Sequence, residues 1–171
     1  SIFNVNLDGK LNWKKNIYKK VYKNVYKNLS LSVSDGIIYI SDNIGFIYAI
    51  TLDAGEPVWF KNYGNPLKSR IKIFNDKIFL VDQSNRILCF DTKNGTKVWD
   101  VRTAQSFIKS QYFLALAISN SGSLVTINSR GDLLKIDTKY GKVIWSLNVA
   151  DTKLAQDIDF FKSSDIVITD N

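Results

Sequence analysis

Short runs of alternating apolar and polar residues cover most of the 171-residue chain. Such alternation is typical of β-strands with one buried face. Small polar residues and glycine separate the runs and predict tight turns, as at Asp35-Gly36. Three pairs of strands are expected from this pattern: Leu31–Ser34 with Ile37–Ser41, Ile71–Phe74 with Lys77–Val81, and Leu114–Ser119 with Leu124–Asn128. The pattern therefore predicts an all-β protein.

A glycine followed four residues later by tryptophan occurs four times, and the chain has no other tryptophan. The tryptophans are 46, 40 and 46 residues apart. An apolar strand precedes each glycine, and in two copies an aspartate stands four residues before it. Glycine supplies the positive φ that a tight turn needs, and aspartate accepts hydrogen bonds from the turn backbone. Each copy therefore predicts a strand, a turn and a second strand that contains the tryptophan.

Two further short strands precede most copies of the motif, so each repeat contains four strands in 40–46 residues. This is the signature of a β-propeller blade. Residues 30–62, 70–102 and 113–148 predict three whole blades of four antiparallel strands. Residues 1–15 predict the outer two strands of a blade, and residues 157–170 predict an inner pair. We expect a single β-propeller domain over residues 1–171, with about four blades' worth of chain.

The pattern Asp-x-x-x-Gly-x-x-x-Trp resembles the repeat of the pyrroloquinoline-quinone-like propeller family. The resemblance implies that each tryptophan docks between neighbouring blades, over the turn of the next blade. Trp13 fits only if its turn is one residue shorter than the others. The resemblance thus implies blade-docking roles for Trp13, Trp59, Trp99 and Trp145, and turn roles for Gly55, Gly95, Gly141, Asp91 and Asp137.

Members of this family usually have seven or eight blades, which leaves three arrangements open for this chain. It could be part of a larger seven- or eight-bladed ring, it could form such a ring as a homodimer, or it could close alone with four blades. We expect the strands of residues 1–15 and 157–170 to pair, either within one chain or between the two chains of a dimer, because unpaired sheet edges promote association.

The family contains quinone-dependent dehydrogenases and a non-catalytic group typified by BamB, of the outer-membrane β-barrel assembly machinery. Compact blades without long insertions resemble the second group. That resemblance implies a periplasmic, outer-membrane-associated scaffold that binds assembly-machinery subunits or client proteins and holds no cofactor. Its targeting segment is expected upstream of Ser1. A fragment of a quinone-dependent dehydrogenase and a sensor or adhesion propeller remain the alternatives.

The composition argues against several kinds of catalysis. The chain has no histidine, which removes the commonest general base and a common metal ligand. Its one cysteine, Cys89, lies in an apolar strand and is expected to be a buried, inert thiol. Ser-His-Asp arrangements and thiolate metal clusters are therefore excluded, and we expect neither an enzyme nor a metal site.

The net charge of +7 is concentrated near the start, where residues 1–28 hold seven lysines and one aspartate. Tyrosines and aliphatic residues recur every fourth position over residues 14–28, and a helix there would carry an apolar stripe surrounded by lysines. Such a segment could bind an acidic protein or an anionic membrane surface. The alternative is an inter-blade excursion packed on its own blade. Nucleic acid is not expected, since the rest of the chain is nearly neutral. The candidate partner-binding residues are Lys15, Lys19, Lys20, Lys23, Lys27, Tyr18, Tyr22 and Tyr26.

Overall fold

The computed structural model describes residues 1–18, 22, 24–104, 113–149 and 165–169. These residues form fourteen strands, β1 to β14, in four antiparallel sheets. Half of a blade, called half-blade I, consists of β1 (Ile2–Val5) and β2 (Leu11–Lys15). Blade II consists of β3 (Leu29–Ser34), β4 (Ile37–Asp42), β5 (Phe46–Thr51) and β6 (Pro57–Asn62). Blade III consists of β7 (Lys72–Phe74), β8 (Lys77–Val81), β9 (Arg86–Asp91) and β10 (Lys97–Arg102). Blade IV consists of β11 (Leu116–Ile118), β12 (Ser123–Ile127), β13 (Asp132–Asp137) and β14 (Val143–Asn148).

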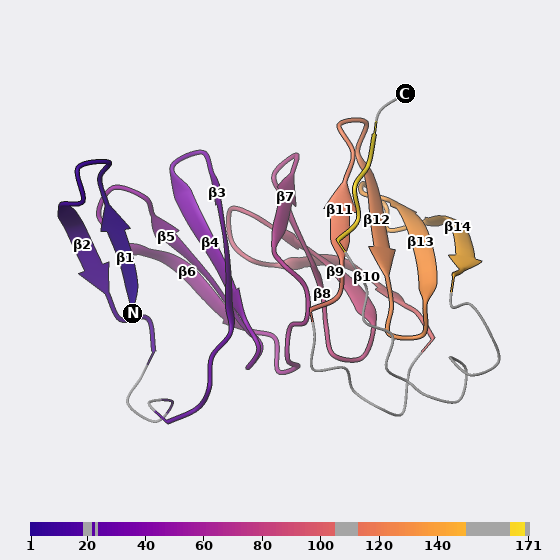
Figure 1. Ribbon diagram of the computed structural model, residues 1–171, viewed down its shortest axis with the longest axis horizontal. Helices are drawn as coiled ribbons and strands as arrows, with labels where there is room; N and C mark the ends of the chain where they lie inside the picture. The colour runs from indigo at the N-terminus through magenta and orange to yellow at the C-terminus, as the bar shows by residue number, and fades with distance from the viewer. Residues whose placement is uncertain (19–21, 23, 105–112, 150–164, 170–171) are drawn as a thin grey trace.

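The sheets stand side by side in chain order, from half-blade I at one end to blade IV at the other (Figure 1). Within blades II, III and IV each strand pairs with the next along the chain, so the last strand of each motif forms an outer edge. The all-β propeller architecture predicted from the sequence is confirmed, and the predicted strand boundaries differ from the observed ones by no more than two residues.

The chain does not close on itself as a four-bladed ring. Among the described residues β1 pairs only with β2, while residues 165–169 lie at the opposite end of the array, beside blade IV (Figure 1). The described residues therefore do not form a four-bladed ring, which was one of the three arrangements left open by the sequence. Residues 166–169 do not form a strand. The two strands that would pair with them in one blade, β1 and β2, lie at the opposite end of the array (Figure 1). The other predicted inner strand, residues 157–161, falls outside the described residues.

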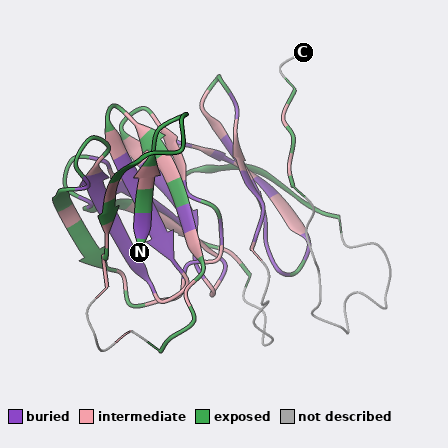
Figure 2. Cartoon of the chain, turned by 60° about the vertical axis from the view of Figure 1, so that its left-hand side comes forward, coloured by how far each residue is buried: buried purple, intermediate pink, exposed green. Residues whose placement is uncertain are grey.

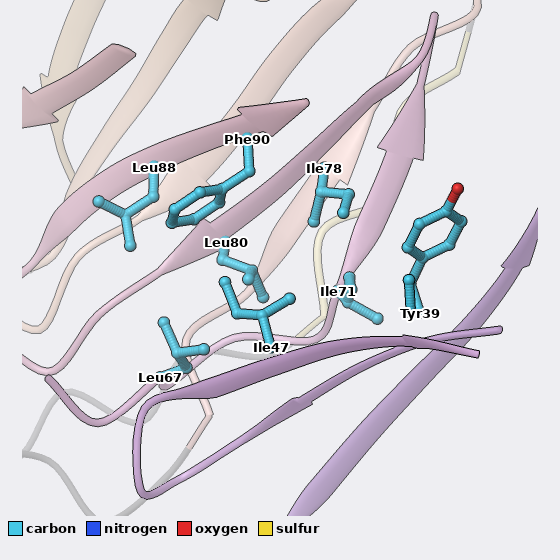
Figure 3. Packing of buried hydrophobic residues seen from close by; sticks show 9 residues of the cluster. Tyr39, Ile47, Leu67, Ile71, Ile78, Leu80, Leu88 and Phe90 are labelled. Atoms are coloured by element: carbon cyan, nitrogen blue, oxygen red, sulfur yellow. The ribbon is translucent and has the colours of Figure 1, made fainter. Parts of the chain in front are cut away.

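Three hydrophobic clusters fill the spaces between neighbouring sheets. The cluster between blades II and III joins Tyr39 and Ile47 from one sheet to Leu80, Leu88 and Phe90 from the next (Figure 3). The central strands of blades II and III are buried, those of blade IV are partly buried, and the outer strands of all three blades are largely exposed (Figure 2). The apolar residues of a blade are thus buried only where a neighbouring blade covers them, as in other repeat proteins.

Cys89 lies inside the cluster between blades III and IV and is fully buried. Burial raises the pKa of its thiol to about 12. The thiol is therefore protonated at neutral pH, as expected from its apolar strand. The described part of the chain contains no helix long and apolar enough to cross a membrane.

Candidate functional site

The turns of the repeat form as the motif predicts. The amide of Gly95 donates to the carbonyl of Asp91 at 2.9 Å, and that of Gly141 donates to the carbonyl of Asp137 at 3.0 Å. Both glycines have positive φ, 67° and 71°. The Asp91 carboxylate also accepts the Lys93 amide, and the Asp137 carboxylate accepts two amides of its turn. Each turn is thus held by backbone and side-chain bonds together.

Three tryptophans dock on the turn of the next blade. The Trp59 ring lies against Gly95 so closely that a Cβ there would be 2.7 Å from the ring, and its indole N–H donates to the Thr92 carbonyl at 2.8 Å. Trp99 packs in the same way on Gly141, with a 3.2 Å bond to the Thr138 carbonyl. Trp13 packs on Gly55 and donates to the Leu52 carbonyl at 3.1 Å. Only glycine leaves room for the ring at these positions.

The first copy has the shorter turn that the sequence predicts. The Gly9 amide donates to the carbonyl of Asn6, three residues earlier, rather than four as in the other copies. The Asn6 side chain accepts hydrogen bonds from the amides of Asp8 and Lys10, so Asn6 has the role that aspartate has in the turns at Gly95 and Gly141. The turn is well formed, yet nothing lies within 4 Å of a Cβ built on Gly9.

Trp145 is the one tryptophan of the four that is not docked on a glycine of the described chain. It occupies the same register position as Trp99, opposite the neighbouring strand of its own blade. Its side chain is 41% exposed. The expected docking role is therefore seen for Trp13, Trp59 and Trp99, and it stays a prediction for Trp145.

A second repeated motif was not singled out from the sequence. Asp42, Asp82 and Asn128 each stand 17 residues before a tryptophan and cap the turn between the two central strands of their blade. One side-chain oxygen of each accepts backbone amides of that turn. Their equal spacing from tryptophan is the signal in the sequence that could have identified the motif.

The second carboxylate oxygen of these aspartates reaches the connection from the preceding blade or half-blade. The Tyr18 hydroxyl donates to Asp42 at 2.6 Å, and the Tyr63 hydroxyl donates to Asp82 at 3.2 Å. Burial raises the pKa of Tyr18, and the hydrogen bond and negative charge of Asp42 raise it further. The Tyr18 hydroxyl therefore keeps its proton at neutral pH and donates it in a hydrogen bond to the buried carboxylate of Asp42.

In the connection between half-blade I and blade II, the helix that one of the two interpretations requires is not seen among the described residues. Its first residues, Lys14 and Lys15, belong to β2, and none of the described residues from 16 to 28 is α-helical. Tyr18 and Tyr22 instead turn into blade II, with edge-on contacts to Tyr48 and Phe46. Burial of these rings outweighs the four-residue periodicity. The alternative of an excursion packed on its own blade is the one observed for these two tyrosines.

The candidate lysines have different surroundings. Lys15 forms an ion pair with Glu56 of blade II at 2.7 Å. The Lys27 ammonium donates to the carbonyls of Tyr22 and Val25 and lies 4.9 Å from the centre of the Tyr18 ring. Lys19, Lys20 and Lys23 lie outside the described residues. Tyr26 is exposed, and it is the candidate tyrosine whose side chain is free to meet a partner.

An aromatic cavity of about 300 Å³ opens beside this connection. Tyr22 lines one side, and Phe46 and Tyr48 of β5 with Phe60 of β6 line the others. The Phe60 ring stacks on Tyr48 with centres 6.3 Å apart, yet it remains 62% exposed. Where blade II has Phe60, the equivalent positions of blades III and IV have Asp100 and Ser146. The phenylalanine on this side of the cavity is thus particular to blade II among the three whole blades.

The described residues contain no group of three or more side chains arranged to hold a metal ion. Their polar side chains serve turns and inter-blade contacts. The structure defines a β-propeller array whose blades are joined by tryptophans docked on glycine turns, with an aromatic cavity at one junction.

The profile of one family, described as outer membrane protein assembly factor BamB, matches residues 2–168. The chain therefore belongs to the BamB family. It is 28% identical over 112 residues to the BamB of Salmonella typhimurium and 28% identical over 122 residues to that of Moranella endobia. These matches cover 66% and 71% of the chain but only 27% and 30% of the relatives, so the matched region is less than a third of each relative.

Solved structures agree on the fold. BamB from Moraxella catarrhalis matches with a TM-score of 0.63 and 18% identity, over 82% of this chain and 41% of that one. A quinohaemoprotein alcohol dehydrogenase from Pseudomonas putida matches with a TM-score of 0.55 and 19% identity, over 68% of this chain and 19% of that one. At such identities the likeness concerns architecture alone, which scaffolds and enzymes of this kind share.

Proposed function

We propose that this chain is a non-catalytic, protein-binding scaffold of the periplasm, associated with the outer membrane, where it contributes to the assembly of β-barrel proteins. Membership of the BamB family supports the assembly role. The observation that carries the binding role is the aromatic cavity of blade II, because an exposed phenylalanine over an apolar cavity is a feature of recognition sites. The partner is an assembly-machinery subunit or a client protein.

The cavity lies directly beside a strand edge. Phe60 and Asn62 line it, and both belong to β6, the outermost strand of its sheet. An extended segment of a partner can add to such an edge through main-chain hydrogen bonds, while pockets select its side chains. A strand added to β6 would bring an apolar or aromatic side chain to the cavity. Unfolded β-barrel proteins have the required chemistry, because apolar and polar residues alternate in the segments that form their strands after folding.

The basic segment supports the same site. Residues 1–28 carry a net charge of +6, and Lys15 stands on the neighbouring half-blade. A concentration of positive charge raises the rate of encounter with acidic partners or an anionic membrane surface. Changing Lys19, Lys20 and Lys23 to Gln should slow association at low salt and have less effect above about 0.15 M, where the screening length is roughly 8 Å.

The test uses an unfolded outer-membrane β-barrel protein, diluted from denaturant and labelled for fluorescence anisotropy. Phe60→Ser should weaken its binding by about tenfold, the effect expected when a partly exposed aromatic contact is lost. Val98→Ser is the matched control, since Val98 is also exposed on an outer strand but lies on β10, away from the cavity. Equal affinity of the Phe60→Ser protein and the wild type would contradict the proposed site. Stoichiometric binding of a quinone would contradict the non-catalytic role.

A further inference from the structure

Tyr48 places a polar atom at a position that is apolar in the other whole blades. The equivalent residues are Leu88 in blade III and Leu134 in blade IV, and both are buried in hydrophobic clusters. Tyr48 is itself only 9% exposed. Its hydroxyl has no hydrogen-bond partner among the described residues, whereas the hydroxyls of Tyr18 and Tyr63 are bonded to aspartates. A buried polar group without a partner calls for an explanation other than packing.

The hydroxyl of Tyr48 is available to a ligand because this side chain lines the aromatic cavity of blade II. Burial raises the pKa of Tyr48 well above the ordinary value of a phenol, and the negative charge of Asp42 raises it further. The hydroxyl is therefore protonated at neutral pH. It can donate a hydrogen bond to a group that enters the cavity.

Asn62 supplies a second donor, on the exposed side of the same cavity. Its side-chain oxygen accepts the Gly64 amide at 2.9 Å, which fixes the orientation of the side-chain amide. The amide nitrogen of Asn62 has no partner among the described residues. The cavity thus combines aromatic walls with two hydrogen-bond donors.

The cavity belongs to a junction inside the array and not to one of its ends. Its walls come from β5, β6 and the connection that leads into blade II. By analogy with the whole blades, further strands of half-blade I would pair with β1, on the side away from β2. Such strands would face β3 and β4, because the first strands of neighbouring blades contact one another, as β3 contacts β7. A further pair of strands therefore does not account for the open space beside β6.

The two donors favour a ligand with an acceptor at the end of an aromatic ring. Among aromatic side chains, phenylalanine has no polar atom and tryptophan has only an N–H donor, whereas the tyrosine oxygen can accept hydrogen bonds. The charge of Asp42 acts on the Tyr48 hydroxyl, so a neutral acceptor suits the site better than a carboxylate. A volume of about 300 Å³ is at the lower end of the range for ligand pockets and suits a single side chain.

We propose that the cavity selects tyrosine in a strand added to β6, with the phenol ring among the aromatic walls and its oxygen accepting hydrogen bonds from Tyr48 and Asn62. This inference rests on the proposed function, because it specifies which side chain of a client strand is recognised. The selected residue stands opposite Phe60 or Asn62, since directly opposite residues of neighbouring strands lie on the same face of a sheet. Client strands supply such residues, because transmembrane β-barrels have girdles of aromatic residues at both membrane interfaces.

Phenylalanine is the competitor that the site is expected to reject. Its ring would fill the cavity and displace water from the Tyr48 hydroxyl without offering an acceptor in return. A donor that loses its water and gains no partner weakens binding. A site that forms a hydrogen bond with a hydroxyl group therefore discriminates against the analogue that lacks it.

Three peptides test this selectivity. They are extended sequences of alternating valine and threonine with charged residues at both ends, labelled for fluorescence anisotropy, and they differ only at one central position. The peptide with tyrosine at this position should bind about tenfold more tightly than the one with phenylalanine, and the one with leucine should bind no better than phenylalanine. Equal binding of the tyrosine and phenylalanine peptides, or no binding of the tyrosine peptide, would overturn the inference.

Tyr48→Phe removes the hydroxyl and keeps the ring. Its affinity for the tyrosine peptide should fall about tenfold, to that for the phenylalanine peptide, whose own binding should not change. Tyr140→Phe is the matched control, since Tyr140 is 72% exposed in the turn of blade IV and should leave all three affinities unchanged. Tyr48→Phe should also unfold at the same urea concentration as the wild type, because the hydroxyl has no partner in the fold. A marked loss of stability would assign the hydroxyl to the core and refute its role in recognition.

An unfolded β-barrel protein separates the failure of this inference from the failure of the proposed function. If Phe60→Ser weakens the binding of that protein but the peptides show no preference for tyrosine, the binding site stands and the selectivity is refuted. If Phe60→Ser leaves that binding unchanged, the proposed site is itself refuted, and the selectivity is refuted with it.

Discussion

Trp99 and Trp145 occupy equivalent positions in blades III and IV, yet one is docked and the other is open. Both follow a glycine turn, and both pair with the neighbouring strand across the same bulge. Trp99 donates to the Thr138 carbonyl and covers Gly141, whereas Trp145 has no such turn among the described residues. The local sequence therefore builds the blade, but only the next blade makes the tryptophan part of a core. Stability in this array resides in the junctions between repeats.

The largest expected effect separates these two tryptophans. Trp99→Ala should lower the free energy of unfolding by about 3 kcal/mol, the lower part of the range for large-to-small changes, because the indole is half-buried. Trp145→Ala should lower it by less than about 1 kcal/mol, because Trp145 is docked on no glycine turn among the described residues. Urea denaturation followed by circular dichroism measures both. Equal losses in the two variants would show that the tryptophan stabilises its own blade rather than the junction.

The glycine side of the junction is expected to be nearly as sensitive. A Cβ on Gly95 would lie 2.7 Å from the Trp59 ring, so Gly95→Ala should destabilise the protein by about 2–3 kcal/mol through overpacking and positive φ together. Gly36→Ala has the same backbone strain in open space and should cost about 1 kcal/mol. The difference between the two variants measures the docking contact. If both cost the same, the ring and turn are not closely packed in solution.

The tyrosine–aspartate pairs should contribute less. Tyr18→Phe removes a donor to the buried carboxylate of Asp42 and should cost about 1–2 kcal/mol. Its pH dependence is a sharper test. Because burial and Asp42 raise the pKa of Tyr18 above that of the unfolded chain, about 10, folding favours the protonated phenol. The contribution is complete below pH 10 and is lost as pH rises further. The unfolding free energy of Tyr18→Phe should therefore fall less steeply above pH 10 than that of the wild type.

The smallest effect is expected for the surface ion pair that spans half-blade I and blade II. Lys15 and Glu56 are both substantially exposed, so Lys15→Gln should change the unfolding free energy by less than about 1 kcal/mol. The effect should vanish at high salt, in contrast to the tryptophan variants, whose losses do not depend on charge. Thermal unfolding at low and high sodium chloride measures this. A large, salt-independent loss would mean that the lysine stem, rather than its charge, packs at the junction.

The repeat made most of the fold predictable from sequence. The spacing of glycine and tryptophan located blades II to IV, and alternation located strands such as Lys77–Val81 without error. The shorter turn at Gly9 was also foreseen. These features are local, since a turn or a strand depends on residues close in sequence.

The features that were missed depend on contacts between distant residues. The sequence left open whether Tyr18 and Tyr22 form a helical stripe or pack on a blade, and only their contacts with Tyr48 and Phe46 decide it. Nothing in the residues around Tyr18 indicates that its hydroxyl meets Asp42. The aromatic cavity likewise depends on Phe60 lying over rings from another strand and from the connection. Tertiary burial overrides local periodicity where the two conflict.

The acceptors of the docked indoles are main-chain carbonyls, of Leu52, Thr92 and Thr138. The docking bond itself therefore places no requirement on the side chain at the acceptor position, which is leucine in one copy and threonine in two. A gene that encodes such repeats can duplicate, lose or recombine a blade without compensating changes at the new boundary. Homologues can then diverge far in sequence and differ in repeat number while each junction keeps the same geometry.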